Sequence, residues 1–259
     1  MKNDPRIPIR HRARLPAGSG ADSVVRVVVW TVIELINKPK ADKRKIMLNS
    51  LKNSWLACLL FPMRNQMWDT QPETLRQLVA DRQKPGLRVL EVGSWCGHST
   101  EIIGKVVKAS DGKMICVDWW RGGDDRITRV NLLRNGYKMF WRRIVKSRLV
   151  DTVIPIRGKS GDVLPLLKDK QFDIIFLDGD HRYNGIKADI KQAKRLIKSS
   201  GTIFGHDCEG KPGKANIDFL DSHKNEDFVD GKHCGVIMAV AEEFKNYDLI
   251  NNFWVVKGG

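Results

Sequence analysis

From residue 87 onward, short apolar runs alternate with amphipathic stretches, and this alternation constrains the fold more than any other feature. The runs are LRVLEVG, KMICVD, TVIPIRG, FDIIFLDGD, GTIFGHD and NNFWVVK. Between them, apolar residues recur at helical spacing, as with Tyr137, Phe140 and Ile144 or with Ile186 and Ile190. Strand and helix alternating over about 170 residues predict an α/β protein with a doubly wound, mostly parallel, seven-stranded sheet and helices on both faces.

The chain before residue 87 has a different organisation. Residues 1–22 mix Pro, Arg and Gly, and we expect a basic, mobile arm there. Residues 23–86 are predicted to form a helical N-terminal extension. It ends in a capped helix within DTQPETLRQLVADRQKPG, where Pro72 lies near the helix start and Pro-Gly stops it. Residues 87–259 then form the domain that carries the sheet.

The net charge of +15 is high for a chain of 259 residues, and residues 1–50 alone supply +7 of it. A basic arm ahead of a mildly basic body suggests an anionic neighbour, such as nucleic acid, a membrane surface or phosphorylated substrates. The plainer alternative is a charged surface that only keeps the protein soluble.

Cysteine usage and hydropathy bear on the compartment. The five cysteines, Cys58, Cys96, Cys116, Cys208 and Cys234, are odd in number and irregularly spaced, so we expect reduced thiols in a cytoplasmic protein. The apolar run at residues 24–36 contains Arg26 and Glu34 and is too short to span a bilayer. We therefore expect neither a targeting segment nor a transmembrane segment.

Carboxylates gather where the predicted strands end, which is where ligands bind in sheets of this type. The first strand ends in LEVGSWCGHST, the second at Asp118, the third near Ser160, the fourth in LDGDH and the fifth in GHD. Four of these five ends carry an acid, inside a basic protein. This placement indicates a binding site at the carboxyl edge of the sheet.

The first two strand ends suggest which molecule the site holds. Gly93 and Gly97 let the backbone approach a ligand, and Glu91 can accept hydrogen bonds from an ammonium group. Ser99 and the N–H groups of the following helix can hold a carboxylate. Asp118 lies 25 residues beyond Gly93, the distance at which an acid binds ribose hydroxyls. An amino acid joined to a ribose is S-adenosylmethionine (SAM).

With these residues, the chain resembles the class I SAM-dependent methyltransferases over roughly residues 87–257. LEVGSWCGHST, IRGKSGDVLPLL and FDIIFLDGDH look like catechol-type O-methyltransferases, whereas LDGDHRYNGIKADI, GTIFGHDC and GVIMAVAEEF look like the bacterial macrocin-type sugar O-methyltransferases. The resemblance implies a Rossmann-like methyltransferase fold and SAM as the methyl donor.

The resemblance also implies roles for individual residues. Glu91 binds the methionine amino group, Asp118 takes the ribose, and Trp119 and Ser160 border the adenine, although Ser160 can equally be the N-cap of the next helix. The full set of predicted donor-binding residues is Glu91, Gly93, Ser94, Gly97, Ser99, Asp118, Trp119, Ser160 and Asp178.

Asp178 and Asp207 are the predicted metal ligands. They end neighbouring strands, roughly 5 Å apart across the sheet, and can share a hard cation such as Mg²⁺. In both similar branches, acids at these places bind metal. Here, however, His206 and Cys208 flank Asp207 where those branches have a second oxygen ligand, and histidine suits a softer metal.

Two residues are candidates for the catalytic base, because a sugar or phenol hydroxyl is a poor nucleophile until its proton is removed. Asp180, the second acid of DGD, is the first choice, and His181 is the second. The alternative for His181 is a purely structural, hydrogen-bonded histidine. Trp120 and its neighbour Trp119 either flank a ligand ring or pack in the core.

Residues 208–234 lack periodicity, and we expect a mobile loop or a lid over the acceptor. Cys208, His223, His233 and Cys234 fit no common zinc-site spacing. The preferred function is methyl transfer to a sugar-like or phenolic hydroxyl of a small molecule, by a homo-oligomer. Alternatives are an RNA methyltransferase that uses the basic arm, a non-catalytic nucleotide-binding module, and a nicotinamide oxidoreductase, which the missing G-x-G-x-x-G disfavours.

Overall fold

The sheet follows from the alternation in the sequence. A computed structural model describes residues 67, 70–121 and 136–258. Seven strands lie in the order β3-β2-β1-β4-β5-β7-β6. They are β1 (Arg88–Val92), β2 (Lys113–Asp118), β3 (Val153–Arg157), β4 (Phe172–Leu177), β5 (Ile197–Gly205), β6 (Asp248–Ile250) and β7 (Phe253–Lys257). The first five strands are parallel, and β7 is antiparallel to β5 and β6. The predicted doubly wound, mostly parallel seven-stranded sheet is confirmed.

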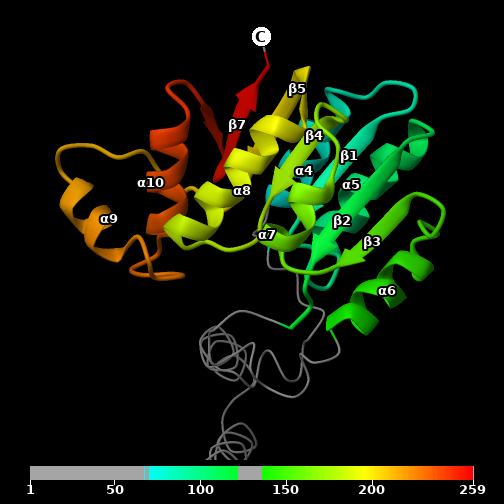
Figure 1. The fold of residues 1–259 in the computed structure, drawn as a ribbon, viewed down its shortest axis with the longest axis horizontal. Coiled ribbons are helices and arrows are strands. Elements are labelled where there is room, and N and C mark those ends of the chain that lie inside the picture. The colour runs from blue at the N-terminus through cyan, green and yellow to red at the C-terminus, as the bar shows by residue number, and fades with distance from the viewer. Residues whose placement is uncertain (1–66, 68–69, 122–135, 259) are drawn as a thin grey trace, which may run out of the picture. The chain divides into compact units, whose positions relative to one another are not determined.

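Helices cover both faces of the sheet (Figure 1). They are α4 (Gln71–Ala80), α5 (His98–Ala109), α6 (Gly136–Lys146), α7 (Ser160–Val163), α8 (Tyr183–Leu196), α9 (Ile217–His223) and α10 (Cys234–Glu243), with a 3₁₀ turn at Leu164–Leu166. The α4 helix confirms that a helix lies between residues 69 and 86. It ends at Ala80, before the Pro-Gly predicted to stop it, and its N-cap residue Thr70 makes no side-chain capping hydrogen bond. Helices α8 and α10 lie side by side on one face.

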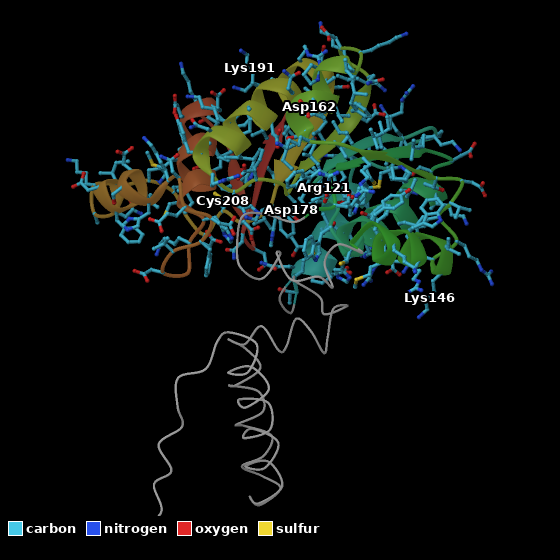
Figure 2. The ribbon with its side chains drawn as sticks, turned by 60° about the horizontal axis from the view of Figure 1, so that its bottom comes forward. Arg121, Lys146, Asp162, Asp178, Lys191 and Cys208 are labelled. Carbon is cyan, nitrogen blue, oxygen red and sulfur yellow. The ribbon has the colours of Figure 1, made fainter. Side chains whose placement is uncertain are left out.

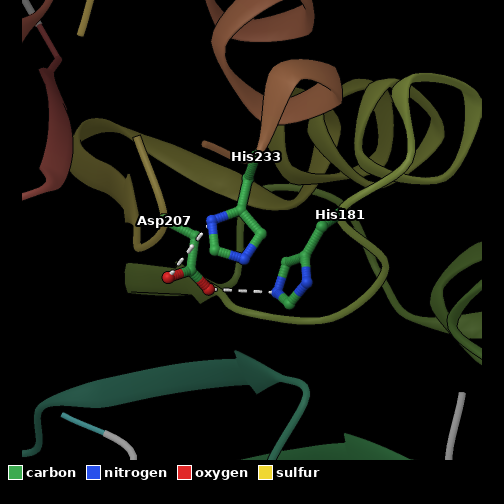
Figure 3. Close-up of side chains that lie close together, drawn as sticks. All are labelled: His181, Asp207 and His233. Atoms are coloured by element: carbon green, nitrogen blue, oxygen red, sulfur yellow. Dashed lines mark ion pairs between the residues drawn. The ribbon is translucent and has the colours of Figure 1, made fainter. Parts of the chain in front are cut away.

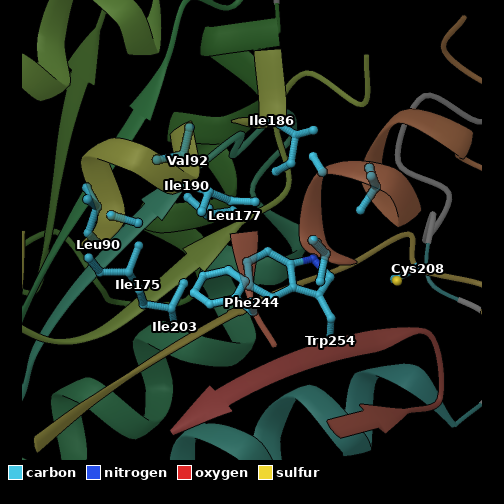
Figure 4. Packing of buried hydrophobic residues seen from close by; sticks show 14 of the residues in the cluster. Leu90, Val92, Ile175, Leu177, Ile186, Ile190, Ile203, Cys208, Phe244 and Trp254 are labelled. Atoms are coloured by element: carbon cyan, nitrogen blue, oxygen red, sulfur yellow. The ribbon is translucent and has the colours of Figure 1, made fainter. Parts of the chain in front are cut away.

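Two hydrophobic clusters follow from the two-residue period of the strands, because successive side chains point to opposite faces. Leu90, Val92 and Leu177 belong to the cluster under α8 and α10, which Figure 4 shows. Val89 and Phe176 belong to the cluster under α4, α5 and α6. The central strand β4 is buried at every position, as expected for a parallel strand covered on both faces.

The register brings the functional strand ends to one edge. Val92 pairs with Val117 on one side and with Leu177 on the other, and Leu177 pairs with Gly205. The residues that follow β1, β2, β4 and β5 therefore share the carboxyl edge of the sheet. Figure 2 labels Asp178 and Cys208, which follow β4 and β5, close to this edge.

Two elements differ from the sequence-based expectation. Strand β5 begins at Ile197, directly after α8 ends at Leu196, and not at the predicted glycine four residues later. Residues 208–234 are not a plain loop, because they contain α9, a helix too short for periodicity to reveal. The predicted arm at residues 1–22 and most of the predicted extension at 23–86 lie outside the described residues. No helix among the residues described is long and apolar enough to cross a membrane.

Candidate active site

Glu91 organises the turn between β1 and α5. Its side chain is fully buried, and its Oε2 accepts hydrogen bonds from Ser94 Oγ, at 2.6 Å, and from the Thr100 hydroxyl. Ser99, in the first turn of α5, also faces this carboxylate. Glu91 Oε1 is buried and finds no hydrogen-bond partner among the described residues. The carboxylate thus holds the turn with one oxygen and keeps the other available to a ligand donor.

The environment of Glu91 disfavours its charge. Burial raises the pKa of Glu91 to about 7, although the hydroxyls of Ser94 and Thr100 partly oppose this shift. A bound ammonium group would lower the pKa of Glu91 again, because its positive charge would stabilise the ionised carboxylate. The predicted role of Glu91 toward an amino group stays a prediction, with the unpartnered Oε1 in its favour.

Both predicted glycines of this turn are required by contacts inside the protein. Gly93 has a φ of 88°, and a Cβ there would lie 1.9 Å from the carbonyl oxygen of Asp178. Gly97 has a φ of 79° and begins α5, and a Cβ there would lie 3.0 Å from the ring of Phe140. Because Gly97 carries no side chain, no side chain at the N-cap position bonds to the first N–H groups of α5. The first N–H groups of α5 are therefore left uncapped by an N-cap side chain, as a carboxylate-binding site at this helix end requires.

Asp118 ties the ends of β1 and β2 together. Its Oδ2 accepts hydrogen bonds from the backbone N–H groups of Ser94, at 3.0 Å, and Trp95, at 2.8 Å. Its Oδ1 accepts one from the N–H of Trp120 at 2.6 Å. Burial raises the pKa of Asp118, and these three N–H groups partly counteract the shift. Since a carboxylate has about four acceptor positions, Asp118 keeps capacity for a hydroxyl at Oδ1.

The two tryptophans after β2 have different surroundings. Trp120 is buried, packs its ring against Tyr137 and Phe140, and donates its indole N–H to the carbonyl of Trp95 at 2.8 Å. Trp119 is 36% exposed, and the ammonium group of Lys159 lies 5.2 Å from its ring centroid. Of the two alternatives, core packing therefore describes Trp120, and Trp119 is the aromatic surface that a ligand ring can reach.

Ser160 begins the short helix α7 after β3. Its side chain hydrogen-bonds to Asp189, a buried residue of α8 whose pKa burial raises to about 7. The N-cap position of α7 is Lys159 and not Ser160. The N-cap alternative is thus wrong, and the predicted place beside an adenine stays a prediction.

Asp178 and Asp207, the predicted metal ligands, converge on the same histidines. His206 Nδ1 lies 3.0 Å from Asp207 Oδ1 and 3.9 Å from Asp178 Oδ1. His181 Nε2 lies 3.1 Å from Asp207 Oδ2 and 3.9 Å from Asp178 Oδ1. The structure therefore brings together both predicted acids, the second candidate base and the flanking histidine at the ends of β4 and β5. His206 Nε2 is buried without a hydrogen-bond partner among the described residues.

The proximity of these groups shifts their pKa values strongly. Burial would lower the pKa of His181, but the carboxylates of Asp178, Asp207 and Asp227 raise it well above its ordinary value. Burial would raise the pKa of Asp207, but hydrogen bonds and charge from His181 and His206 hold it well below its ordinary value. Such mutual shifts in one cluster are typical of functional sites.

Three further residues lie against these groups and were not predicted from the sequence to share a site: Glu209, Asp227 and His233. His233 Nδ1 lies 2.7 Å from Glu209 Oε1 and 3.7 Å from Asp207 Oδ1. Asp227 Oδ1 lies 2.9 Å from His181 Nδ1. All three come from residues 208–234, where no periodicity indicates which side chains turn inward. The zinc set considered there does not form, because Cys208 bonds to the Gly210 carbonyl and His223 faces Phe219 and Ser222.

Asp180 has a different set of contacts. Its Oδ1 accepts hydrogen bonds from the backbone N–H and the Nε of Arg182, at 3.0 and 2.8 Å, and its Oδ2 accepts one from Arg182 Nη2 at 2.8 Å. The carboxylate is about one third exposed. Arg182 thus binds both oxygens of Asp180, and the choice of base stays a prediction.

Of the nine non-glycine residues with positive φ in the described parts of the chain, three lie just after the ends of β1, β2 and β5 at this edge of the sheet. Trp95, Trp120 and Asp207 have φ values of 43°, 50° and 60°. Left-handed backbone costs a residue with a side chain about 1–2 kcal/mol, so surrounding contacts must hold these residues in place. For Trp95 and Trp120, the carboxylate of Asp118 supplies those contacts. Strain at three strand ends is consistent with a site at this edge.

Comparison with known proteins identifies related domains. Residues 90–208 match a family model described as a methyltransferase domain. This segment contains the end of β1 and all of β2, β3, β4 and β5, and thus the strand ends described above. A search of the curated proteins finds no match for the sequence.

Several solved structures have a similar fold. The O-methyltransferase TomG from Streptomyces achromogenes, in complex with SAM, is 16% identical, with 81% of this chain and 90% of that chain covered and a TM-score of 0.53. The O-methyltransferase from Bacillus cereus, in complex with SAH, is also 16% identical, with 89% and 97% covered and a TM-score of 0.52. The SAH-bound methyltransferase PaMTH1 from Podospora anserina is 15% identical, with 95% and 99% covered and a TM-score of 0.52. The predicted Rossmann-like fold is confirmed.

Proposed function

Residues 90–208 match a methyltransferase domain and the fold is that of SAM-bound methyltransferases, and from that premise we propose that the chain transfers a methyl group from SAM to a hydroxyl group of a small molecule. One observation carries the proposal. In a chain that matches a methyltransferase domain, Asp118 at the end of β2 fastens the glycine-bounded turn that follows β1. This is the place where a doubly wound sheet binds a nucleoside.

The residues at the ends of β1 and β2 suit the parts of the donor. Asp118 Oδ1 can accept a ribose hydroxyl, and the exposed ring of Trp119 offers a surface for the adenine. The first N–H groups of α5, with Ser99 in the first turn, can hold the methionine carboxylate. Glu91 Oε1, buried and without a partner among the described residues, fits the amino group. When bound, SAM supplies a methyl group that its sulfonium already activates.

The protein must then align an acceptor hydroxyl with that methyl group and remove its proton. The acids at the ends of β4 and β5 line the neighbouring part of the same edge. We propose that Asp180 takes the proton, with His181 as the second candidate. His181 comes second because both of its ring nitrogens already face carboxylates, Nε2 that of Asp207 at 3.1 Å and Nδ1 that of Asp227 at 2.9 Å.

We also propose that Asp178 and Asp207 help to hold a divalent cation. Both carboxylates lie against the same two histidines, and the buried Nε2 of His206 has no partner among the described residues. When present, such a cation lowers the pKa of a hydroxyl group that it contacts.

A cytoplasmic location fits the four cysteines in the described residues, which are all free thiols.

The proposal is tested by incubating the full chain with SAM and a panel of sugars and phenols, and by mass spectrometry for products heavier by one methyl group. Small RNAs belong in the same panel, because the net charge of +15 favours polyanions. We expect turnover on a hydroxyl acceptor. Asp180→Asn should lower kcat by at least ~100-fold, and His181→Asn by less, as loss of a general base does.

The control is Asp162→Asn, an acid in the short helix α7, which should keep full activity. Methylation of RNA alone would contradict the proposed acceptor class. Unchanged turnover in both Asp180→Asn and His181→Asn would show that neither residue is the base.

A further inference from the structure

Two histidines and an aspartate face one another at the ends of β4 and β5 (Figure 3). They are His181, after β4, Asp207, after β5, and His233, directly before α10. One ligand atom from each lies within 4.8 Å of the others. This histidine–carboxylate cluster shares Asp207 with the predicted metal pair but adds the imidazoles of His181 and His233, neither of which was a predicted metal ligand.

Each of the two imidazoles has a carboxylate behind it. His181 Nδ1 lies 2.9 Å from Asp227 Oδ1, and His233 Nδ1 lies 2.7 Å from Glu209 Oε1. Glu209 Oε2 also accepts the backbone N–H of His233 at 2.9 Å. Metal-binding histidines typically donate one ring N–H to a carboxylate in this way, which fixes the tautomer and directs the other nitrogen at the metal.

The remaining ring nitrogens point into one space. His181 Nε2 lies 3.1 Å from Asp207 Oδ2. The two imidazole rings are 4.6 Å apart at 63°, and Figure 3 shows the other nitrogen of His233 turned toward His181. Two nitrogens and a carboxylate oxygen thus converge, with Asp178 Oδ1 close by, at 3.9 Å from His181 Nε2.

Charge and burial favour a cation at this point. Four carboxylates lie in or against the histidine–carboxylate cluster, in a protein of net charge +15: those of Asp178, Asp207, Glu209 and Asp227. The side chains of His181, Asp207 and His233 are 23%, 18% and 14% exposed. They are therefore largely shielded from water and still reachable by an ion.

From this geometry we infer that His181, His233 and Asp207 bind a first-row transition-metal dication of the zinc class in preference to Mg²⁺. Mg²⁺ requires near-octahedral oxygen ligands, whereas imidazole nitrogens suit Zn²⁺, Co²⁺, Ni²⁺ and Fe²⁺. Three protein ligands leave a coordination position for another molecule. The catalytic use of that position rests on the proposed function, but the binding of the metal does not.

The inference also explains the composition of residues 208–234. Glu209, Asp227 and His233 all come from this segment, and each contributes to the cluster. A metal bound to His233 therefore connects the segment that contains α9 to the strand ends of the sheet. We expect metal binding to protect this segment from proteolysis.

The test uses the full chain, without a histidine tag and stripped of metal. Calorimetric titrations with Zn²⁺ and with Mg²⁺ give the two affinities, and Co²⁺ serves as a spectroscopic probe, since nitrogen ligation at low coordination number gives intense visible bands. We expect one Zn²⁺ per chain, bound at least ~100-fold more tightly than Mg²⁺. His233→Ala should lower the Zn²⁺ affinity by at least ~100-fold and abolish the Co²⁺ bands.

His223→Ala is the matched control. His223 lies on α9 in the same segment but faces Phe219 and Ser222, so its loss should leave the Zn²⁺ affinity unchanged. Asp227→Asn tests the supporting carboxylate at a half-exposed position where the fold tolerates change, and should weaken Zn²⁺ by ~10–100-fold. Equal affinities for Zn²⁺ and Mg²⁺, or wild-type Zn²⁺ binding by His233→Ala, would overturn the inference.

The outcome is independent of the proposed function. If Zn²⁺ binds as expected but no acceptor is methylated, the metal site stands and the function fails. If methyl transfer proceeds in metal-stripped protein that does not bind Zn²⁺, the function stands and this inference fails.

Discussion

At the scale of single residues, the site depends on polar groups that the fold buries at a cost. Glu91 lies on the central strand pair β1–β4, where both faces of the sheet are covered, and so it is fully buried. Within the fold, this carboxylate accepts hydrogen bonds from the hydroxyls of Ser94 and Thr100 and also faces Ser99. We propose that a positively charged ligand group reaches its Oε1, which is buried without a partner among the described residues.

The raised pKa of Glu91 makes stability depend on pH. The pKa is about 7 in the folded protein against 4.5 for the ordinary side chain. Below pH 4.5 both states hold the proton, whereas between 4.5 and 7 the unfolded chain ionises first. Stability is therefore lost as pH rises through this window, and above it the penalty amounts to about 3 kcal/mol.

Glu91→Gln should remove this penalty. We expect the variant to be more stable than the wild type by about 3 kcal/mol at pH 8, with the difference vanishing near pH 4.5. Its affinity for SAM should fall by roughly tenfold, because a hydrogen bond to a charged group is lost. Urea unfolding at several pH values measures the first effect, and calorimetry the second.

The matched control for that variant is Glu73→Gln, on the exposed face of α4, which should change stability by less than about 0.5 kcal/mol at either pH. A Glu91→Gln protein that gains no stability at pH 8 would contradict the account of burial. A variant that binds SAM as the wild type does would leave Glu91 a structural residue only.

At the scale of elements, the residues at the strand ends could be predicted from the sequence, whereas the site residues within 208–234 could not. Apolar runs and the acids after them identify Asp118, Asp178 and Asp207 directly, because parallel strands place their carboxyl ends together. His233 gave no such signal, since it follows an aperiodic segment and reaches the site only through the path of α9 and α10. The sequence also could not predict why a glycine is needed at position 93, because the closest contact of Gly93 is with Asp178, a residue distant in sequence.

Gly93 joins two elements, because its missing side chain lets the end of β1 approach the end of β4. A Cβ at Gly93 would lie 1.9 Å from a backbone oxygen, which cannot move without displacing β4. Gly93→Ala should therefore destabilise the fold by more than about 3 kcal/mol. Gly86→Ala has a similar φ of 69° but open space, and should cost only about 1–2 kcal/mol.

Thermal and urea unfolding of both variants measure this difference. Equal destabilisation would mean that the φ angle alone, and not the contact with Asp178, accounts for the glycine.

At the scale of the whole molecule, the sheet order places two kinds of chemistry side by side. Strands β2, β1, β4 and β5 are consecutive neighbours. The proposed donor residues lie at or just after the ends of β2 and β1, and the histidine–carboxylate cluster lies beside the ends of β4 and β5. Because adjacent strands are about 4.8 Å apart, a methyl group held at the first pair lies within reach of an acceptor held at the second. The protein as a whole is strongly basic, and the carboxylates at this edge therefore form a local acidic region.

The most direct test of this account is a calorimetric titration of the full chain with SAM, and with NAD for comparison. We predict that one SAM binds per chain and that NAD does not bind. Asp118→Asn should weaken SAM by at least ~10-fold, whereas Asp111→Asn, at the opposite end of β2, should change it by less than about twofold. A wild-type protein that does not bind SAM, or an Asp118→Asn variant that binds it unchanged, would contradict the proposed donor site.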